Sequence, residues 1–362
     1  MANRMTVQMN GNPVYDIVLE QDFQALPAEL EKLNLQSRKI CIVTDSNVAS
    51  LYLEEVKRLM EPCCRQVISF VFPAGEENKN LDTVRNLYET LILGKFDRND
   101  MLAALGGGVV GDLCGFAAAT YLRGVSFIQL PTTLLSQVDS SIGGKTGVDF
   151  DAYKNMVGAF HMPRLVYENI GSLKTLPAEQ FSAGMGEVIK HGLIQSRAYY
   201  EWILSHREEI RSMEMGTLEE LVVESNHIKR RVVERDPEEK GDRMLLNFGH
   251  TLGHAIEKLK NFELLHGECV ALGSIAGMYI SAKRGLLPTE EIDRFCDALS
   301  WFGLKTSTDG LDRDEVIAAT ANDKKMDSGV IRFILLREIG QAFVDRTVTR
   351  EEMAEALELI LR

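Results

Sequence analysis

Three histidines lie close together in this sequence, and their spacing is suited to holding a metal ion. The chain has seven histidines, and His250, His254 and His266 fall between positions 250 and 266. His250 and His254 are four positions apart, so a helix presents both side chains on one face. This spacing is used in zinc sites, although the H-E-x-x-H motif itself is absent. The pattern predicts a metal site, and the alternative is that these histidines cap or pack helices.

The residues alone leave the other ligands open. Glu187 and His191 are also four positions apart, in GMGEVIKHG on a separate predicted helix, and either could reach the ion. The choice between His250 and His254 is equally open, while His266 stands at an expected helix start. Three nitrogen or oxygen ligands with an open fourth position would describe a catalytic rather than a structural zinc site.

A glycine-rich turn predicts phosphate binding. Residues 106–111 read GGGVVG, which fits G-x-G-x-x-G, and they follow a predicted strand at 101–105 and precede a small-residue helix at 115–120. Glycines let the backbone approach a pyrophosphate, and a helix N-terminus supplies amide donors. The alternative is a tight turn without a ligand.

Two features of this turn depart from the usual dinucleotide fingerprint. The turn follows a later strand rather than the first one, and the acid expected about 20 residues on is missing. The next carboxylate after Asp112 is Asp139. Asp45, at the end of the first clear strand, could hold a ribose hydroxyl instead.

A dense polar segment at 131–149 offers further donors for hydroxyls and phosphate. It contains PTT, DSS and a Gly-Gly-Lys-Thr turn. The turn resembles the end of a P-loop, but Ser140 occupies the place of the first glycine, so a nucleoside-triphosphate site is poorly supported. A plain loop is the alternative.

The composition restricts the partners of the chain. Its 362 residues carry 40 basic and 53 acidic side chains, a formal net charge of −13. Such a charge disfavours nucleic acid and anionic membrane surfaces. An anionic small molecule then needs positive charge gathered in one place. Basic residues beside glycines, asparagines or the predicted ligands could supply it: Lys145, Lys154, Lys190, Lys229, Arg243 and the pair Lys324 and Lys325.

The arrangement of apolar segments predicts an α/β fold. Strand and helix patterns alternate from about residue 38, which favours a parallel sheet with crossover helices. Beyond about residue 176 helical patterns dominate, and 330–340 is the one late strand-like run. We expect a Rossmann-like NAD-binding domain at 1–175 and a mainly α-helical metal- and substrate-binding domain at 176–362. The six cysteines show no C-x-x-C pair, and no apolar run is long enough for a membrane helix, so we expect a soluble cytoplasmic protein.

Several motifs together resemble the 3-dehydroquinate synthase family. They include QLPTTLLSQVDSSIGGKTGVD at 129–149, KNMVGAF at 154–160, GMGEVIKHGLI at 184–194, LLNFGHTLGHAIE at 245–257 and HGE at 266–268. The resemblance runs from about 39 to 340. It implies an NAD- and zinc-dependent homodimer of the shikimate pathway, with Co²⁺ as a second possible metal. The reaction implied is conversion of 3-deoxy-D-arabino-heptulosonate 7-phosphate to 3-dehydroquinate and phosphate. The alternatives are a metal-dependent polyol dehydrogenase, another sugar-phosphate cyclase, and a non-catalytic NAD or metal sensor that binds without turnover.

Carried over by position, the resemblance implies a role for each site residue. Glu187, His250 and His266 would hold the metal, and His254 would serve substrate binding and proton transfer. The implied NAD contacts are Asp45, Asn47, Gly75, Glu76, Lys79, Gly108, Val109, Val110, Gly111, Asp112, Thr132, Thr133, Lys145, Lys154 and Thr175. The implied substrate contacts are Asp139, Lys145, Lys154, Asn155, Lys190, Lys229, Arg243, Asn247 and one of Lys324 and Lys325. Arg123 would reach the phosphate of the neighbouring subunit's substrate.

Overall fold

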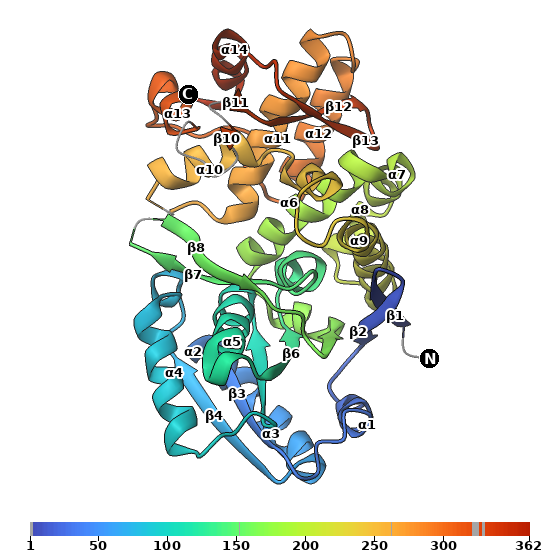
Figure 1. Cartoon of the computed structure of the whole chain (residues 1–362). Helices are drawn as coiled ribbons and strands as arrows, with labels where there is room; N and C mark the ends of the chain where they lie inside the picture. The colour runs from blue at the N-terminus through green and yellow to red at the C-terminus, as the bar shows by residue number, and fades with distance from the viewer. Residues whose placement is uncertain (1–2, 152, 262, 321–325, 328–329) are drawn as a thin grey trace. The chain divides into compact units, whose positions relative to one another are not determined.

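The chain folds into two compact units. The structure, a computed structural model, describes all residues except 1–2, 152, 262, 321–325 and 328–329 (Figure 1). One unit comprises Met1–Leu176 and the other Pro177–Arg362. The expected fold class, Rossmann-like in the N-terminal part and mainly helical in the C-terminal part, is confirmed.

The first unit is built on a seven-stranded sheet. Its strands are β1 (Asn3–Met9), β2 (Asn12–Glu20), β3 (Lys39–Asp45), β4 (Gln66–Phe72), β5 (Met101–Gly106), β6 (Ser126–Pro131) and β9 (Leu165–Asn169). The order is β1-β2-β9-β6-β5-β3-β4, and only the β1–β2 pair is antiparallel. Because β3 pairs with β4 on one side and β5 on the other, the chain changes direction across the sheet at β3. Open α/β sheets bind ligands at the carboxyl ends of strands beside such a point.

Helices cover both faces of this sheet. They are α1 (Leu26–Glu31), α2 (Ser46–Val48), α3 (Glu54–Met60), α4 (Leu81–Leu93) and α5 (Gly108–Thr120), with a π-helical turn at Ala49–Leu53 between α2 and α3. Cys41 and Val43 of β3 pack with side chains of α4 and α5, whereas Ile40 and Ile42 pack with those of α1 and α3. A strand buried on both faces has a continuous apolar run, which explains residues 40–43 of β3.

Two hairpins in this unit were not predicted. Strands β1 and β2 meet at Asn10 and Gly11, whose φ angles of 52° and 76° suit the tight turn that Asn-Gly favours. Strands β7 (Lys145–Phe150) and β8 (Tyr153–Phe160) form a separate antiparallel pair. The Gly-Gly-Lys-Thr turn therefore leads into a strand, whereas a P-loop leads into a helix, and this rules out the nucleoside-triphosphate reading.

The second unit is mainly helical. Its helices are α6 (Ala178–Gln195), α7 (Arg197–Ser205), α8 (Arg207–Arg211), α9 (Met215–Arg235), α10 (His250–Leu259), α11 (His266–Lys283), α12 (Glu290–Trp301), α13 (Arg313–Thr320) and α14 (Arg350–Ile360). Its strands are β10 (Met326–Asp327), β11 (Val330–Ile331), β12 (Phe333–Glu338) and β13 (Gln341–Asp345). The prediction of a single late strand was wrong, because β12 turns back into β13 at Gly340, whose φ is 92°.

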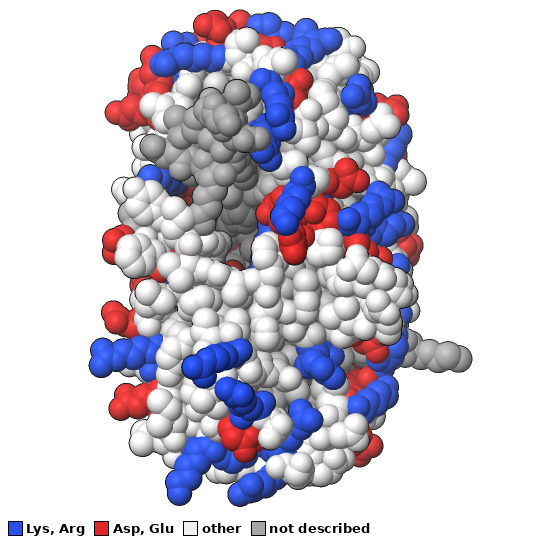
Figure 2. Space-filling model, in the orientation of Figure 1, with Lys and Arg blue, Asp and Glu red and all other residues white. Residues whose placement is uncertain are grey.

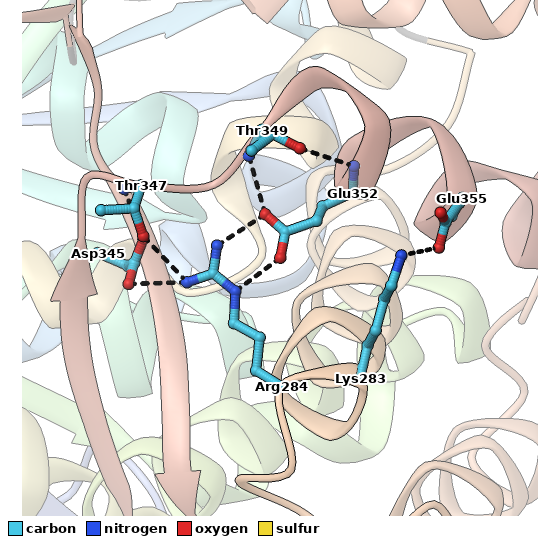
Figure 3. A network of polar contacts seen from close by, with 7 residues as sticks. All are labelled: Lys283, Arg284, Asp345, Thr347, Thr349, Glu352 and Glu355. Atoms are coloured by element: carbon cyan, nitrogen blue, oxygen red, sulfur yellow. Dashed lines mark hydrogen bonds and ion pairs between the residues drawn. The ribbon is translucent and has the colours of Figure 1, made fainter.

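A polar network joins the last helix of this unit to its neighbours (Figure 3). The Arg284 guanidinium donates two hydrogen bonds of 2.7 Å to the Glu352 carboxylate and one of 3.0 Å to Asp345. Thr349 caps α14 by accepting from the Glu352 backbone N–H, and Glu352 accepts from the Thr349 N–H in return. One arginine at the end of α11 thus fastens both β13 and α14.

The charged residues of the surface are mixed. On the face shown in Figure 2, acidic and basic side chains of the described residues are interspersed rather than gathered by sign. Within the described part of the chain, we find no helix that combines the length and the hydrophobicity needed to cross a bilayer.

Candidate functional site

Three helices of the second unit bring a carboxylate and two histidines together. Glu187 of α6 is fully buried, and its Oε1 lies 3.8 Å from Nε2 of His250 in α10 and 3.7 Å from Nε2 of His266 in α11. Among the described residues, this buried Oε1 has no hydrogen-bond partner. An orphaned carboxylate oxygen is costly unless something else satisfies it.

The second ring nitrogen of each of these histidines faces an acceptor. Nδ1 of His250 lies 3.1 Å from the Phe248 carbonyl oxygen, and Nδ1 of His266 lies 3.4 Å from Glu257 Oε2. A proton on each Nδ1 leaves the lone pair on Nε2, which is the tautomer that binds a metal through Nε2. Both lone pairs then point to the side where Glu187 offers its oxygen.

A divalent cation fits this donor set. Ligand atoms on one tetrahedral zinc ion lie about 3.4 Å apart, given bonds of about 2.1 Å, so separations of 3.7 and 3.8 Å are suitable. The His254 ring stands beside this pair, with its centroid 5.0 Å from that of His250 and 5.7 Å from that of His266. The three histidines could also hold an ion among themselves, since their ligand atoms lie within 4.8 Å of one another.

Close backbone packing makes the convergence possible. A Cβ at position 267 would lie 1.9 Å from the Ala183 carbonyl oxygen of α6, and a Cβ at 273 would lie 1.9 Å from the Gly249 carbonyl oxygen. Only glycine therefore allows α11 to approach α6 and the start of α10 so closely. Gly267 directly follows His266, so the close contact lies next to the residue whose ring faces Glu187.

The two residues that the sequence left open at α6 have different surroundings in the structure. The His191 ring is fully buried and its Nδ1 lies 2.7 Å from Ser225 Oγ of α9. Glu187 is the residue of this pair that faces His250 and His266. Its other oxygen, Oε2, accepts a hydrogen bond from Lys190 Nζ, which also donates to the Leu246 carbonyl at 2.7 Å.

Three further predicted substrate residues of this unit lie in α9 and in a 3₁₀ helix at Asp242–Asn247, just before α10. Lys229 is 5% exposed and Arg243 is 2% exposed. Arg243 donates to the Pro237 carbonyl at 2.6 Å, and Asn247 donates to Glu239 Oε1 at 2.9 Å. The unit that carries the histidines therefore also contains the buried Lys229 and Arg243 and the half-buried Asn247.

Two acidic residues before this 3₁₀ helix, Asp236 and Glu239, were not predicted from the sequence. Asp236 accepts backbone hydrogen bonds from Lys240, Gly241 and Arg243, at 2.9, 2.6 and 3.1 Å. Burial alone would raise the pKa of Asp236, but these N–H groups lower it. Glu239, the acceptor for Asn247, has a φ of 59°. The signal in the sequence was RDPEEKGD, a turn-forming stretch just before the predicted substrate residues.

In the first unit, the predicted NAD residues lie at the carboxyl ends of neighbouring strands. Asp45 ends β3, Gly75 and Glu76 follow β4, Gly108 follows β5, and Thr132 and Thr133 follow β6. In the GGGVVG segment, Gly106 ends β5, Gly107 is the N-cap and Gly108 begins α5, so the prediction that the helix starts at 115 was wrong. Within the described chain no side chain caps α5, which leaves its first amides for an anion such as a pyrophosphate. This fits NAD.

An ion-pair cluster around the buried Lys79 adjoins these strand ends. Lys79 Nζ donates to Asp112 Oδ2 at 2.6 Å and to Asn155 Oδ1 at 2.7 Å. Lys79 and Lys154 both lie near Glu76 Oε1, at 3.8 and 3.6 Å. Burial would lower the pKa of Lys79, but the Asp112 and Glu76 carboxylates raise it above its ordinary value. Lys79 is therefore a fixed positive charge.

The remaining predicted residues are placed as follows. Thr175 contacts the Tyr52 hydroxyl, and Asp139 lies in a π-helical turn at Ser136–Ser140. Asp45 Oδ1 accepts from the backbone N–H groups of Asn47 and Val48. Lys145 and Arg123 are exposed, and Arg123 has a φ of 68°. Val109 is half-buried and Val110 and Gly111 are buried in α5. Lys324 and Lys325 lie outside the described residues.

The cysteines offer no nucleophile. All six are free thiols, and burial raises the pKa of Cys41 to about 12 and those of Cys64 and Cys296 to about 11. A nucleophilic cysteine needs a lowered pKa.

Solved structures define the class to which this fold belongs. A 2-epi-5-epi-valiolone synthase from Streptomyces hygroscopicus subsp. jinggangensis 5008, solved with NAD+ and Zn2+ bound, matches with a TM-score of 0.88 at 28% identity, over 95% of this chain and 96% of that chain. A 2-deoxy-scyllo-inosose synthase complexed with carbaglucose-6-phosphate, NAD+ and Co2+ matches with a TM-score of 0.85 at 25% identity, over 98% and 99%. The chain has the fold of sugar-phosphate cyclases.

Sequence comparison identifies the family within this class. Residues 69–183 match the model of the 3-dehydroquinate synthase N-terminal domain, and residues 184–326 match that of the C-terminal domain. The 3-dehydroquinate synthase of Acetivibrio thermocellus is 43% identical over 339 residues, which are 94% of this chain and 94% of that protein. The chain belongs to the 3-dehydroquinate synthase family.

Proposed function

We propose that this chain is a 3-dehydroquinate synthase, which converts 3-deoxy-D-arabino-heptulosonate 7-phosphate to 3-dehydroquinate and phosphate. The observation that carries the proposal is the buried Glu187 Oε1, which has no hydrogen-bond partner among the described residues and faces Nε2 of His250 and of His266. Family membership supports the reaction, and the donor set supports a divalent metal, Zn²⁺ or Co²⁺.

Two bound groups belong to the proposal. When bound, the cation would supply Lewis acidity to a substrate oxygen, and NAD would accept and return a hydride, so that no net oxidation occurs. Glu187, His250 and His266 would hold the cation. The first amides of α5 and the residues at the carboxyl ends of β3 to β6 would hold NAD, which assigns residues 1–175 to NAD and 176–362 to metal and substrate.

The side chains around the metal ligands would bind and orient an anionic sugar phosphate. Lys190 and Arg243 are cations that are 1% and 2% exposed. Lysine and arginine bind carboxylates and phosphates through charge-assisted hydrogen bonds, and the proposed substrate carries both groups. The full set proposed for substrate contact is Asp139, Lys145, Lys154, Asn155, Lys190, Lys229, Arg243, Asn247, His254 and one of Lys324 and Lys325.

His254 is proposed as the proton-transfer residue. Its imidazole stands beside the rings of His250 and His266. An imidazole nitrogen can take a proton from a substrate hydroxyl and return it near neutral pH, because the ordinary pKa of histidine is about 6.5. We also propose a cytoplasmic homodimer in which the exposed Arg123 of one subunit reaches the substrate phosphate of the other.

Phosphate release tests the proposal. Protein stripped of metal should release phosphate from the heptulosonate phosphate only when both NAD and Zn²⁺ are added, and NADH should not accumulate. Accumulation of NADH in proportion to product would contradict the closed redox cycle. Oxidation of neutral polyols with net NADH formation, and no phosphate release, would identify a polyol dehydrogenase instead.

A further inference from the structure

Glu257 is a buried carboxylate to which the proposed reaction gives no role. It lies in α10 and is 2% exposed. Because it follows His250 by seven positions and His254 by three, all three side chains lie on one face of the helix. The face that carries the histidines therefore also carries this carboxylate.

Glu257 contacts the proposed metal ligand His266, at the ring nitrogen that is not the one near Glu187. Its Oε2 lies 3.4 Å from Nδ1 of His266, while Nε2 of the same ring lies 3.7 Å from Glu187 Oε1. The His266 imidazole thus stands between two carboxylates, one at each nitrogen. The two nitrogens of an imidazole point in different directions, so Glu257 cannot bind the ion that Nε2 would bind.

This geometry has a specific chemical consequence. A neutral imidazole that binds a cation through Nε2 carries its proton on Nδ1, and a carboxylate is a strong acceptor for that proton. Such a partner fixes the tautomer and the orientation of the ring and increases the electron donation from Nε2. At His250 the same role falls to the Phe248 backbone carbonyl, which a substitution does not remove.

The balance of charges around the proposed cation also favours a carboxylate at the position of Glu257. A divalent cation bound by one carboxylate and two neutral imidazoles keeps a net positive charge, and the nearby buried Lys190 adds another. Burying a carboxylate costs several kcal/mol unless opposite charge compensates it. Glu257 lies one imidazole away from the site where that positive charge would be.

We infer that Glu257 is a positioning residue of the metal centre, which holds His266 with its Nε2 lone pair directed at the ion. The inference rests on the proposed metal site at Glu187, His250 and His266. It adds a residue outside the ligand set whose loss weakens metal binding without removing a ligand.

Zinc affinity of the full-length protein tests this inference. The dissociation constant for Zn²⁺ is measured by competition with a chromogenic chelator for the wild type, Glu257→Gln, Glu257→Asp and the control Glu291→Gln. Glu291 is also a buried glutamate of this unit, 7% exposed, but it pairs with Arg197 and Arg294. We expect Glu257→Gln to bind zinc about 10- to 100-fold more weakly, Glu257→Asp to recover part of this loss, and Glu291→Gln to bind as the wild type does.

The outcomes separate this inference from the proposed function. Wild-type affinity in Glu257→Gln, together with zinc binding by the wild type that His250→Ala abolishes, would overturn the role of Glu257 and leave the metal site intact. Failure of the wild type to bind zinc would overturn the proposed site itself. The Co²⁺-loaded proteins give a spectroscopic readout, since a weaker His266 donor shifts the visible absorption bands, and a purely structural role would leave them unchanged.

A measurement on the wild type covers the case in which Glu257→Gln folds poorly. Nitrogen-15 NMR of histidine-labelled, zinc-loaded protein identifies which ring nitrogen of His266 carries the proton, with His266→Gln used for assignment. We expect the proton on Nδ1 and the metal on Nε2. The reverse arrangement would overturn the inference.

Discussion

The two polar clusters of this molecule differ in how they balance their charges. In the first unit, Lys79 is surrounded by Asp112, Asn155 and Glu76, so its buried positive charge is matched by acceptors of the chain itself. In the second unit, Glu187 Oε1 has no hydrogen-bond partner among the described residues and two histidine nitrogens face it. The buried charge of the first cluster is matched within the chain, whereas we propose that a cation completes the second.

This difference explains why the two clusters serve different purposes. A self-compensated ion pair fixes the positions of its members, here the loop after β4 and the start of β8. Converging lone pairs that have no hydrogen-bond donor instead favour the binding of a ligand, and that binding stabilises the folded state. Stability of the first cluster should therefore be independent of added metal, and stability of the second should depend on it.

The largest effect on stability is expected for Lys79→Met. This change removes the charged donor of the Asp112 carboxylate, whose side chain is 17% exposed, and of the amide oxygen of the exposed Asn155. Loss of one member of a buried ion pair costs about 3 kcal/mol. We therefore expect the free energy of unfolding, measured with denaturant, to fall by that amount with or without a metal chelator.

The double variant Lys79→Met/Asp112→Leu is the matched control. It removes both charges and should regain most of the lost stability. A single variant as stable as the wild type, or a loss that depends on chelator, would contradict the description of this cluster as self-compensated.

A smaller effect is expected for Gly267→Ala. The new Cβ would lie 1.9 Å from the Ala183 carbonyl oxygen, so α11 must move away from α6, at a cost of about 2 kcal/mol. Since His266 adjoins this position, zinc affinity should fall as well, as calorimetric titration can measure. Gly216→Ala is the control, because there the added Cβ would meet only the flexible Glu214 carboxylate, at 3.3 Å. Equal zinc affinity in both variants would argue against close packing as the cause of the ligand geometry.

The smallest effect is expected for Arg284→Ala. This change breaks the network in Figure 3, which belongs to neither of the two polar clusters. Its hydrogen bonds lower the pKa of Glu352 from the ordinary 4.5. The stabilisation is therefore present above about pH 4.5 and is lost as the pH falls through the lowered pKa. We expect a loss of about 1 kcal/mol at neutral pH that shrinks in acid.

Unfolding curves between pH 3 and pH 7 measure this prediction. The wild type should lose stability with acid more steeply than Arg284→Ala. Lys283→Ala, which breaks the exposed pair with Glu355 and removes only the smallest of the interactions that lower the pKa of Glu352, is the control and should change the slope less. Parallel curves for wild type and Arg284→Ala would contradict the assignment.

Much of the fold could be predicted because its signals are local. The apolar run of β3 and the helical period of α4 and α9 follow directly from burial on both faces or on one stripe. The α5 start was misjudged because glycines are poor helix formers by themselves, and here packing against β5 and β6 outweighs that preference. The β1–β2 hairpin could have been found from Asn10-Gly11 between alternating apolar residues.

The site was only partly accessible from the sequence. Spacing along α10 indicated that His250 and His254 share a face, but which of them faces Glu187 depends on how α6, α10 and α11 pack. That packing depends on contacts such as Gly267 against Ala183, which join positions far apart in the chain. Glu257 could have been noticed from its seven-residue spacing to His250, yet its contact with His266 is a property of the folded structure.

The central claim is that Glu187, His250 and His266 form a cation site on which phosphate release depends. The most direct test titrates Zn²⁺ into metal-stripped protein while phosphate release is measured in the presence of NAD. We predict that one ion binds per chain, that the rate follows occupancy, and that Glu187→Gln loses both binding and rate. Full activity of the stripped protein, or zinc binding by Glu187→Gln with wild-type affinity, would contradict the account.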